Sequence, residues 1–142
     1  MNIRQITDRF FVAPQIEATD MQALAEAGFS LVINNRPDME VGLDHASSAM
    51  QAAAEAAGLS YVANPLTMET MTPDRQSLQG DSAASATGKV LAYCRSGTRS
   101  AICWTLSQAG KVPADDLLAA TAAAGYDLSN LEAHLRAKDA DV

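Results

Sequence analysis

The 142-residue sequence has few of the residues that build disulfide frameworks or metal sites. It contains two cysteines, Cys94 and Cys103, and two histidines, His45 and His134, which lie far apart along the chain. Neither pair has the spacing of a disulfide scaffold or of a zinc site. The sequence therefore predicts no metal ion and no cofactor.

Positive charge and long apolar stretches are also scarce. Ten Lys and Arg residues face 17 Asp and Glu residues, which gives a net charge of −7. Because nucleic acids and anionic membranes require a basic surface, we expect neither as a partner. No apolar stretch is long enough to span a bilayer, and residues 1–5 lack the apolar region of a signal peptide. We therefore expect a cytoplasmic protein, where thiols stay reduced.

The chain length and the alternation of strand and helix patterns predict one α/β domain over residues 1–142. Helices should flank a central, mostly parallel sheet in three layers, and the last two helices should cover the sheet. Residues 80–88 either prolong the preceding helix weakly or form a loop. Strands are expected at 2–6, 9–13, 29–34, 59–64 and 90–93, and helices at 19–27, 44–57, 72–79, 99–108, 113–124 and 128–138.

One basic stretch stands out from this acidic background. Cys94 follows the apolar run 90–93, and small and basic residues separate it from the helix expected at 99–108. Such a loop points several backbone N–H groups at one spot, and the following helix adds the positive end of its dipole. Anions should bind there, and the same groups favour a thiolate. This pattern predicts that Cys94 is a nucleophile.

The other residues of the loop have roles that suit an anion site. Gly97 allows a tight backbone conformation, and the hydroxyl of Ser100 or Thr98 can donate a hydrogen bond to the sulfur. Arg99 carries a planar group that binds oxyanions through two parallel hydrogen bonds. We predict Cys94, Arg99 and Ser100 as catalytic residues. The loop residues expected to bind the anion are Arg95, Ser96, Gly97 and Thr98.

Two further loops should open at the same edge of the sheet, because the carboxyl ends of parallel strands meet there. The loop after strand 29–34 contributes Arg36, which would add positive charge, and Asp38, which either acts as an acid or only caps a turn. In the loop at 65–72, Glu69 is the stronger candidate for a general acid. Asp74 is better explained as a helix-start residue, and Cys103 as a core residue.

The motif Tyr93-Cys-Arg-Ser-Gly-Thr-Arg-Ser100 resembles the active-site loop of rhodanese-type sulfurtransferases, and more loosely the Cys-x5-Arg loop of cysteine phosphatases. Together with residues 10–16 and 32–38, it makes nearly the whole chain similar to the beta-lactamase-hydrolase-like, phosphatase-like domain family. That resemblance implies a dual-specificity-phosphatase-like fold with a rhodanese-like loop. Members of the family have been labelled both phosphatase and sulfurtransferase.

The spacing between Cys94 and Arg99 helps to choose between a phosphatase and a sulfurtransferase. Arg99 lies one position earlier than a phosphatase arginine would, so the motif is Cys-x4-Arg, and a narrower ring suits one sulfur atom better than a phosphoryl group. The leading hypothesis is a sulfurtransferase that takes sulfur from thiosulfate or a persulfide onto Cys94 and passes it to a thiol acceptor. The alternatives are a phosphatase acting through a cysteinyl-phosphate and a non-catalytic anion-binding or redox-sensing domain.

Overall fold

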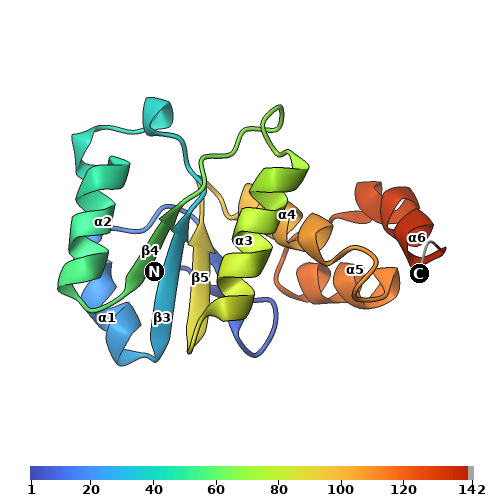
Figure 1. Ribbon diagram of the computed structural model, residues 1–142, viewed down its shortest axis with the longest axis horizontal. Helices are drawn as coiled ribbons and strands as arrows, with labels where there is room; N and C mark the ends of the chain where they lie inside the picture. Colours follow the sequence, from blue (N-terminus) through green and yellow to red (C-terminus); the bar gives the residue numbers. More distant parts are fainter. Residues whose placement is uncertain (141–142) are drawn as a thin grey trace.

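A computed structural model describes residues 1–140 and shows a five-stranded sheet with helices on both faces (Figure 1). The strand order is β1-β2-β5-β3-β4. β1 runs antiparallel to β2, and all other neighbouring strands are parallel. The three-layer α/β fold with a mostly parallel sheet is thus confirmed. The strands are β1 Arg4–Gln5, β2 Phe10–Ala13, β3 Phe29–Asn34, β4 Ser60–Ala63 and β5 Lys89–Tyr93.

Two pairs of helices cover the sheet, and a third pair extends the molecule sideways (Figure 1). α1 and α2 lie on one face, and α3 and α4 on the other. The expectation that the last two helices cover the sheet is wrong, because α5 packs against α4 and α6 packs against α5. The bounds are α1 Met21–Glu26, α2 Ser47–Ala56, α3 Pro73–Ser85, α4 Thr98–Gln108, α5 Ala114–Ala123 and α6 Glu132–Ala140. Within residues 1–140, no helix has the length and apolar character needed to cross a membrane.

Several helix ends differ from the sequence prediction. Single 3-10 turns, Ala18–Asp20 and Leu43–His45, precede α1 and α2, so both α-helices begin later than expected. α3 continues to Ser85, and residues 80–85 therefore prolong the helix. Gly80 lies where α3 meets α4, and a Cβ atom there would lie 3.2 Å from the Cβ of Ser107. The glycine thus allows the two helices to approach closely.

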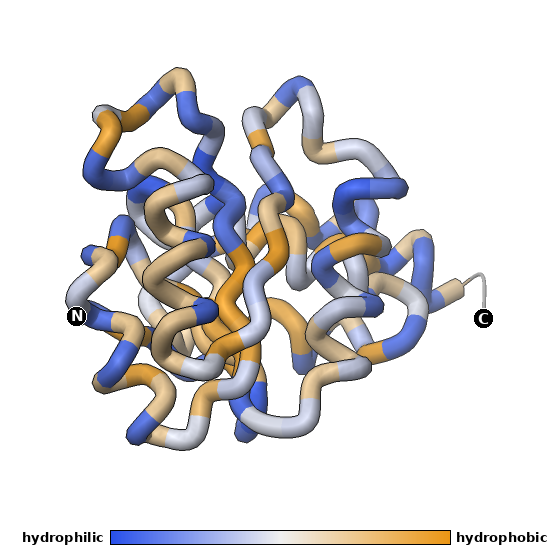
Figure 2. The backbone as a smooth tube through the Cα atoms, turned by 60° about the vertical axis from the view of Figure 1, so that its left-hand side comes forward, coloured by the Kyte–Doolittle hydropathy of each residue, from blue (hydrophilic) through white to orange (hydrophobic). Residues whose placement is uncertain are grey.

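The two central strands are apolar on both faces, because each face packs against a helical layer. Val32 and Leu91 belong to the core on the α1–α2 side, whereas Ile33 and Ala92 belong to the core on the α3–α4 side. All four are fully buried. The hydropathy of the chain shows the same arrangement, with the strands forming an apolar centre under more polar loops (Figure 2).

The register of the sheet brings three loops to one edge. Tyr93, the last residue of β5, pairs with Ala13 of β2 on one side and with Asn34 of β3 on the other. Asn34 in turn pairs with Ala63 at the end of β4. The loops that follow β3, β4 and β5 therefore meet at the carboxyl edge, where open α/β sheets bind ligands.

A fully buried polar network joins these loops to α3 and α4. Asn35 Nδ2 donates to Gln79 Oε1 at 2.6 Å and to Ser100 Oγ at 3.0 Å. Asn64 Nδ2 donates to Asn35 Oδ1 at 3.1 Å, and Gln79 Nε2 donates to the Ser100 carbonyl at 3.2 Å. Because buried polar groups are costly when unpaired, the network favours one arrangement of the loops.

Replacing Gln79 tests how much the buried network contributes to stability. Gln79→Leu leaves Asn35 Nδ2 and the Ser100 carbonyl with fewer buried partners, so we expect the free energy of unfolding to fall by about 1–3 kcal/mol. Urea denaturation measures the change. Gln22→Leu on the exposed face of α1 is the control, with an expected change within about 0.5 kcal/mol. Equal stability of the two variants would contradict the role of the network.

Candidate active site

Cys94 is the first residue after β5, and its side chain is fully buried. Its backbone N–H donates to the Ala13 carbonyl at 3.3 Å, which holds the loop against β2. The sulfur accepts a hydrogen bond from the Gly97 backbone N–H, with 3.1 Å between nitrogen and Sγ. The loop thus folds over the sulfur and points a backbone donor at it.

The hydrogen bond to the sulfur comes from the backbone and not from the hydroxyls expected to donate it. Ser100 Oγ accepts from Asn35 Nδ2, and Thr98 Oγ1 accepts from Ser96 Oγ at 3.0 Å. Arg95 is exposed, and its carbonyl accepts from the Gln15 N–H at 3.3 Å. The hydroxyls therefore bind to neighbouring side chains and hold the loop in shape.

Gly97 meets two separate constraints. Its φ of +94° lies in the left-handed region at the start of α4, which favours glycine. In addition, a Cβ atom at this position would lie 2.1 Å from the Tyr126 hydroxyl oxygen. That hydroxyl donates to the Ser96 carbonyl at 3.1 Å. Sequence analysis identified Gly97 but missed Tyr126, because the residue follows α5 and has no local motif.

Arg99 lies in the first turn of α4, where Glu40 binds it through two hydrogen bonds. Nη1 donates to Glu40 Oε2 at 2.9 Å and to the Leu66 carbonyl at 2.6 Å, and Nη2 donates to Glu40 Oε1 at 2.8 Å. The hydrogen bond to Glu40 raises the pKa of Arg99, and the nearby Cys94 side chain adds to that shift. The guanidinium is therefore a fixed cation beside the sulfur.

Arg36 contacts the same carboxylate. Its Nε lies 3.3 Å from Glu40 Oε1, and its Nη2 donates to the Glu40 carbonyl at 3.3 Å. Nη1 donates to Gln15 Oε1 at 3.1 Å. Hydrogen bonds from Arg99 first, and then from Arg36, lower the pKa of Glu40. The structure brings Arg36 to the site, as expected, but places it on Glu40.

Glu40 is a second residue of the candidate site that the sequence interpretation missed. It lies in the 3-10 turn Asp38–Glu40 of the loop after β3, and the available signal was an acidic residue in that loop. Asp38 was selected instead, but its Oδ1 accepts from the Ser47 N–H at 2.8 Å, at the start of α2. The Asp38 carboxylate therefore accepts a backbone hydrogen bond at the N-terminus of α2.

The other two acidic residues considered lie in the loop after β4 and at the start of α3. Glu69 is exposed in that loop. Within residues 1–140, neither Glu69 nor Asp38 forms a hydrogen bond with the loop at 94–100. Asp74 accepts from the Thr72 hydroxyl, which lowers its pKa, and it occupies the first turn of α3 as expected.

Cys103 is fully buried in α4, which agrees with its expected place in the core. Burial raises the pKa of its thiol to about 12. The thiol is therefore neutral near pH 7, whereas a nucleophile must be a thiolate.

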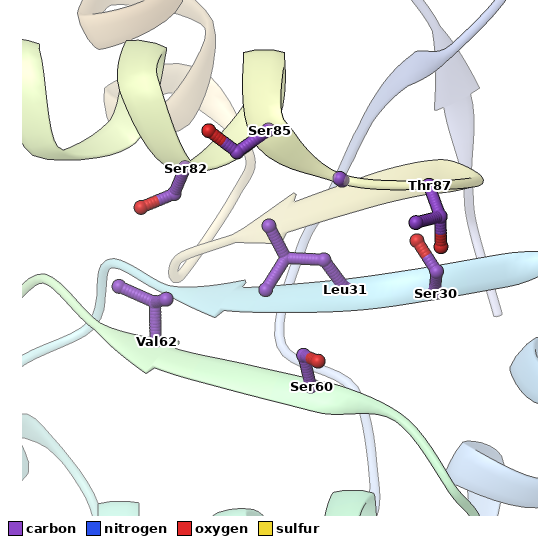
Figure 3. Close-up of a pocket in the computed structure, with 8 residues that line it drawn as sticks. Ser30, Leu31, Ser60, Val62, Ser82, Ser85 and Thr87 are labelled. Atoms are coloured by element: carbon purple, nitrogen blue, oxygen red, sulfur yellow. The ribbon is translucent and has the colours of Figure 1, made fainter.

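Two cavities of about 320 Å³ adjoin the sheet. One lies beside the candidate site, where Pro37, Met39, Ala63 and Pro65 form apolar walls next to Arg36. The other lies between the sheet and the end of α3, near the beginning of β3, and is lined by hydroxyl groups (Figure 3). Cys94 lies at the opposite end of the strands, so of these two cavities the first adjoins the candidate site and the second does not. The hydroxyl-bearing residues of the second cavity are Ser30, Ser60, Ser82, Ser85 and Thr87.

The parallel sheet and the cysteine loop after its central strand define a cysteine-phosphatase-like domain. Residues 2–111 match the family described as "Beta-lactamase hydrolase-like protein, phosphatase-like domain". The chain belongs to this family, as its motifs suggested.

Relatives of known sequence and structure agree with this assignment. A beta-lactamase hydrolase-like protein of Xylella fastidiosa Temecula1 is 34% identical over 90% of this chain, which spans 30% of that protein's length. A protein of Neisseria meningitidis Z2491, provisionally assigned as a phosphatase, has a TM-score of 0.82 and 27% identity, covering 97% of this chain and 99% of its own. The catalytic core of the S. cerevisiae PP-IP phosphatase SIW14 shares the fold, with a TM-score of 0.65, 8% identity, and coverage of 98% and 84%.

The two constraints on Gly97 can be separated by mutation. Gly97→Ala should lower the free energy of unfolding by more than the 1–3 kcal/mol or so that a positive φ costs, because the new methyl group also meets Tyr126. Gly58→Ala is the matched control, since Gly58 has a φ of +83° and a Cβ atom there would meet no atom within 4 Å. Urea denaturation compares the two variants. Equal losses would show that the contact with Tyr126 does not constrain the loop.

Proposed function

We propose that this domain is a cysteine-dependent phosphatase in which Cys94 attacks a phosphate monoester. The observation that carries the proposal is the sulfur placed under the Gly97 N–H, beside the fixed guanidinium of Arg99. Membership of a phosphatase-like family and likeness to phosphatases support it. Sulfur transfer was the leading hypothesis from the sequence, and these similarities favour the alternative instead.

The reaction has two steps. The Cys94 thiolate attacks phosphorus, a phosphorus–sulfur bond forms, and the bond to the ester oxygen breaks, so that the alcohol leaves with its electron pair and takes a proton from water. Water then attacks the cysteinyl-phosphate, which releases inorganic phosphate and returns the thiolate. Backbone N–H groups of the loop and Arg99 stabilise the charge on the phosphoryl oxygens.

The surroundings of the sulfur favour aryl esters. Asp38 is bonded to the start of α2, and Glu40 is bonded to two arginines, so neither carboxylate is free to protonate a leaving group. A phenolate leaves without such help far more easily than an alkoxide does. The apolar cavity between Met39 and Pro65 can take the aromatic ring.

Sulfur transfer is the second candidate, because the Cys-x4-Arg spacing favours it and the reaction needs no general acid. The thiolate would attack the outer sulfur of thiosulfate and release sulfite, leaving a persulfide on Cys94. A thiol acceptor, as thiolate, would then attack the outer sulfur and return the Cys94 thiolate. The reducing cytoplasm expected from the sequence suits both reactions, since both need Cys94 unoxidised.

Turnover and intact-mass measurements distinguish the two reactions. We expect wild-type protein to hydrolyse 4-nitrophenyl phosphate, Cys94→Ser to lose about 1,000-fold or more in kcat, and Cys103→Ser to retain activity. In parallel, each protein is treated with thiosulfate and then with a thiol. A sulfur adduct on Cys94 that the thiol removes catalytically, without ester hydrolysis, would favour sulfur transfer. Oxidation of Cys94 without turnover of either substrate would favour a redox-sensing domain.

The engagement of Asp38 and Glu40 in hydrogen bonds also predicts a strong dependence on the leaving group. We expect kcat/KM for alkyl phosphates to fall below that for aryl phosphates by at least the factor of about 10²–10⁴ that a positioned general acid supplies. A series of substituted phenyl phosphates, with glycerol phosphate as the alkyl ester, measures the dependence. A weak dependence in the wild type that becomes strong in Glu69→Gln would instead identify Glu69 as the acid.

A further inference from the structure

The Glu40 carboxylate lies between two guanidinium groups beside Cys94. Its Oε1 is 2.8 Å from Arg99 Nη2 and 3.3 Å from Arg36 Nε, and its Oε2 is 2.9 Å from Arg99 Nη1. The side chains of both arginines are only 16% exposed, and that of Glu40 is 29% exposed. Two positive charges and one negative charge leave this cluster, Arg36–Glu40–Arg99, with a surplus of one positive charge.

The hydrogen bonds of Arg99 leave one edge of its guanidinium available. A guanidinium has five N–H donors in a plane. Glu40 takes one donor from each Nη, and the Leu66 carbonyl takes a second from Nη1. Among residues 1–140, these three hydrogen bonds leave Nε–H and one N–H of Nη2, which lie on the same edge, for an anion near the neighbouring Cys94 sulfur. Two parallel donors on one edge are the arrangement that binds an oxyanion in bidentate fashion.

Arg99 needs an anchor because of its place in the fold. It lies in the first turn of α4, where the positive end of the helix dipole disfavours a cation. A long side chain in that field would turn toward solvent unless a negative charge held it. Glu40 supplies that charge, because its lowered pKa keeps it ionised near pH 7.

We propose that Glu40 is the positioning residue of this anion site. Its carboxylate holds one end of Arg99, so that the Nε edge faces the substrate oxyanion, and Arg36 acts through Glu40 by binding both its side chain and its carbonyl. The proposal takes from the proposed function only that the ligand is an oxyanion. Phosphate esters and thiosulfate both satisfy that condition.

The opposite role for Glu40 makes a contrary prediction. If the Glu40 carboxylate occupied the place of the substrate, the carboxylate would compete with the substrate anion. Neutralising Glu40 would then strengthen anion binding. A positioning residue has the reverse effect, because Arg99 loses its orientation when the carboxylate is neutralised. The sign of the change in affinity therefore separates the two roles.

The test measures binding of inorganic phosphate and of thiosulfate by calorimetry, without turnover. We expect Glu40→Gln to raise the Kd about tenfold, a change of about 1.4 kcal/mol. The Kd of Glu40→Asp should lie between those of the wild type and Glu40→Gln, because aspartate keeps the negative charge on a shorter side chain. Asp44→Asn is the matched control: it removes one negative charge from the same loop, at an exposed residue, and should leave the Kd unchanged.

The role of Arg36 is tested in the same assay. Arg36→Met should also raise the Kd, but the double variant with Glu40→Gln should bind no more weakly than Glu40→Gln alone, because Arg36 acts through that carboxylate. Additive losses would assign Arg36 to direct anion binding and overturn its proposed role. Urea denaturation of each variant confirms that it is folded, and Glu40→Asp serves if Glu40→Gln is not.

Three results would overturn the proposal for Glu40: tighter binding by Glu40→Gln, an unchanged Kd, or failure of the wild type to bind either anion. Failure of the proposed function gives a different result. In that case esters are not hydrolysed, yet the loss of phosphate or thiosulfate affinity in Glu40→Gln persists.

Discussion

The position of β5 between β2 and β3 is the constraint on which the rest of the site depends. These strands are parallel and in register at Tyr93, so the loops that follow β2 and β3 begin beside Cys94. The loop that follows β4 begins at the same edge. Gln15 of the loop after β2 binds the Arg95 backbone, and the Leu66 carbonyl of the loop after β4 binds Arg99. The loop after β3 contributes Asn35, which binds Ser100, and Glu40, which binds Arg99. Cys94 and its loop are thus surrounded by groups that are far apart in the sequence.

The carboxyl edge of the sheet carries positive charge at the site, whereas the chain as a whole is negatively charged. A net charge of −7 would repel an anionic substrate at long range, so attraction must arise locally. Arg36, Arg99 and the loop amides provide it, and Glu40 offsets one of the two cations without filling every donor of Arg99. The site therefore carries one surplus positive charge next to an apolar cavity.

Local patterns in the sequence were sufficient to predict the centre of the site. Cys94 and Gly97 belong to a contiguous motif, and the apolar run at 29–34 identified β3 as a buried strand, whereas its pairing with β5 comes from the structure. Contacts between distant segments had no such signal, so Glu40 and Tyr126 were missed. The packing of α5 on α4 was also missed, because periodicity shows that a helix has an apolar face but not which element covers it. The predicted starts of α1 and α2 were too early, because each helix is preceded by a 3-10 turn that the sequence pattern did not distinguish from an α-helix.

The place of Arg99 in α4 is connected with the role of Glu40. Gly97 caps α4, which begins at Thr98, so Arg99 belongs to the helix and its backbone direction is set by the helix. The Gly97 N–H that donates to the sulfur does not orient the side chain of Arg99. The orientation must come from other elements, and the structure supplies it from β3 through Glu40 and from β4 through the Leu66 carbonyl. The geometry around Cys94 therefore depends on two neighbouring loops as much as on the motif itself.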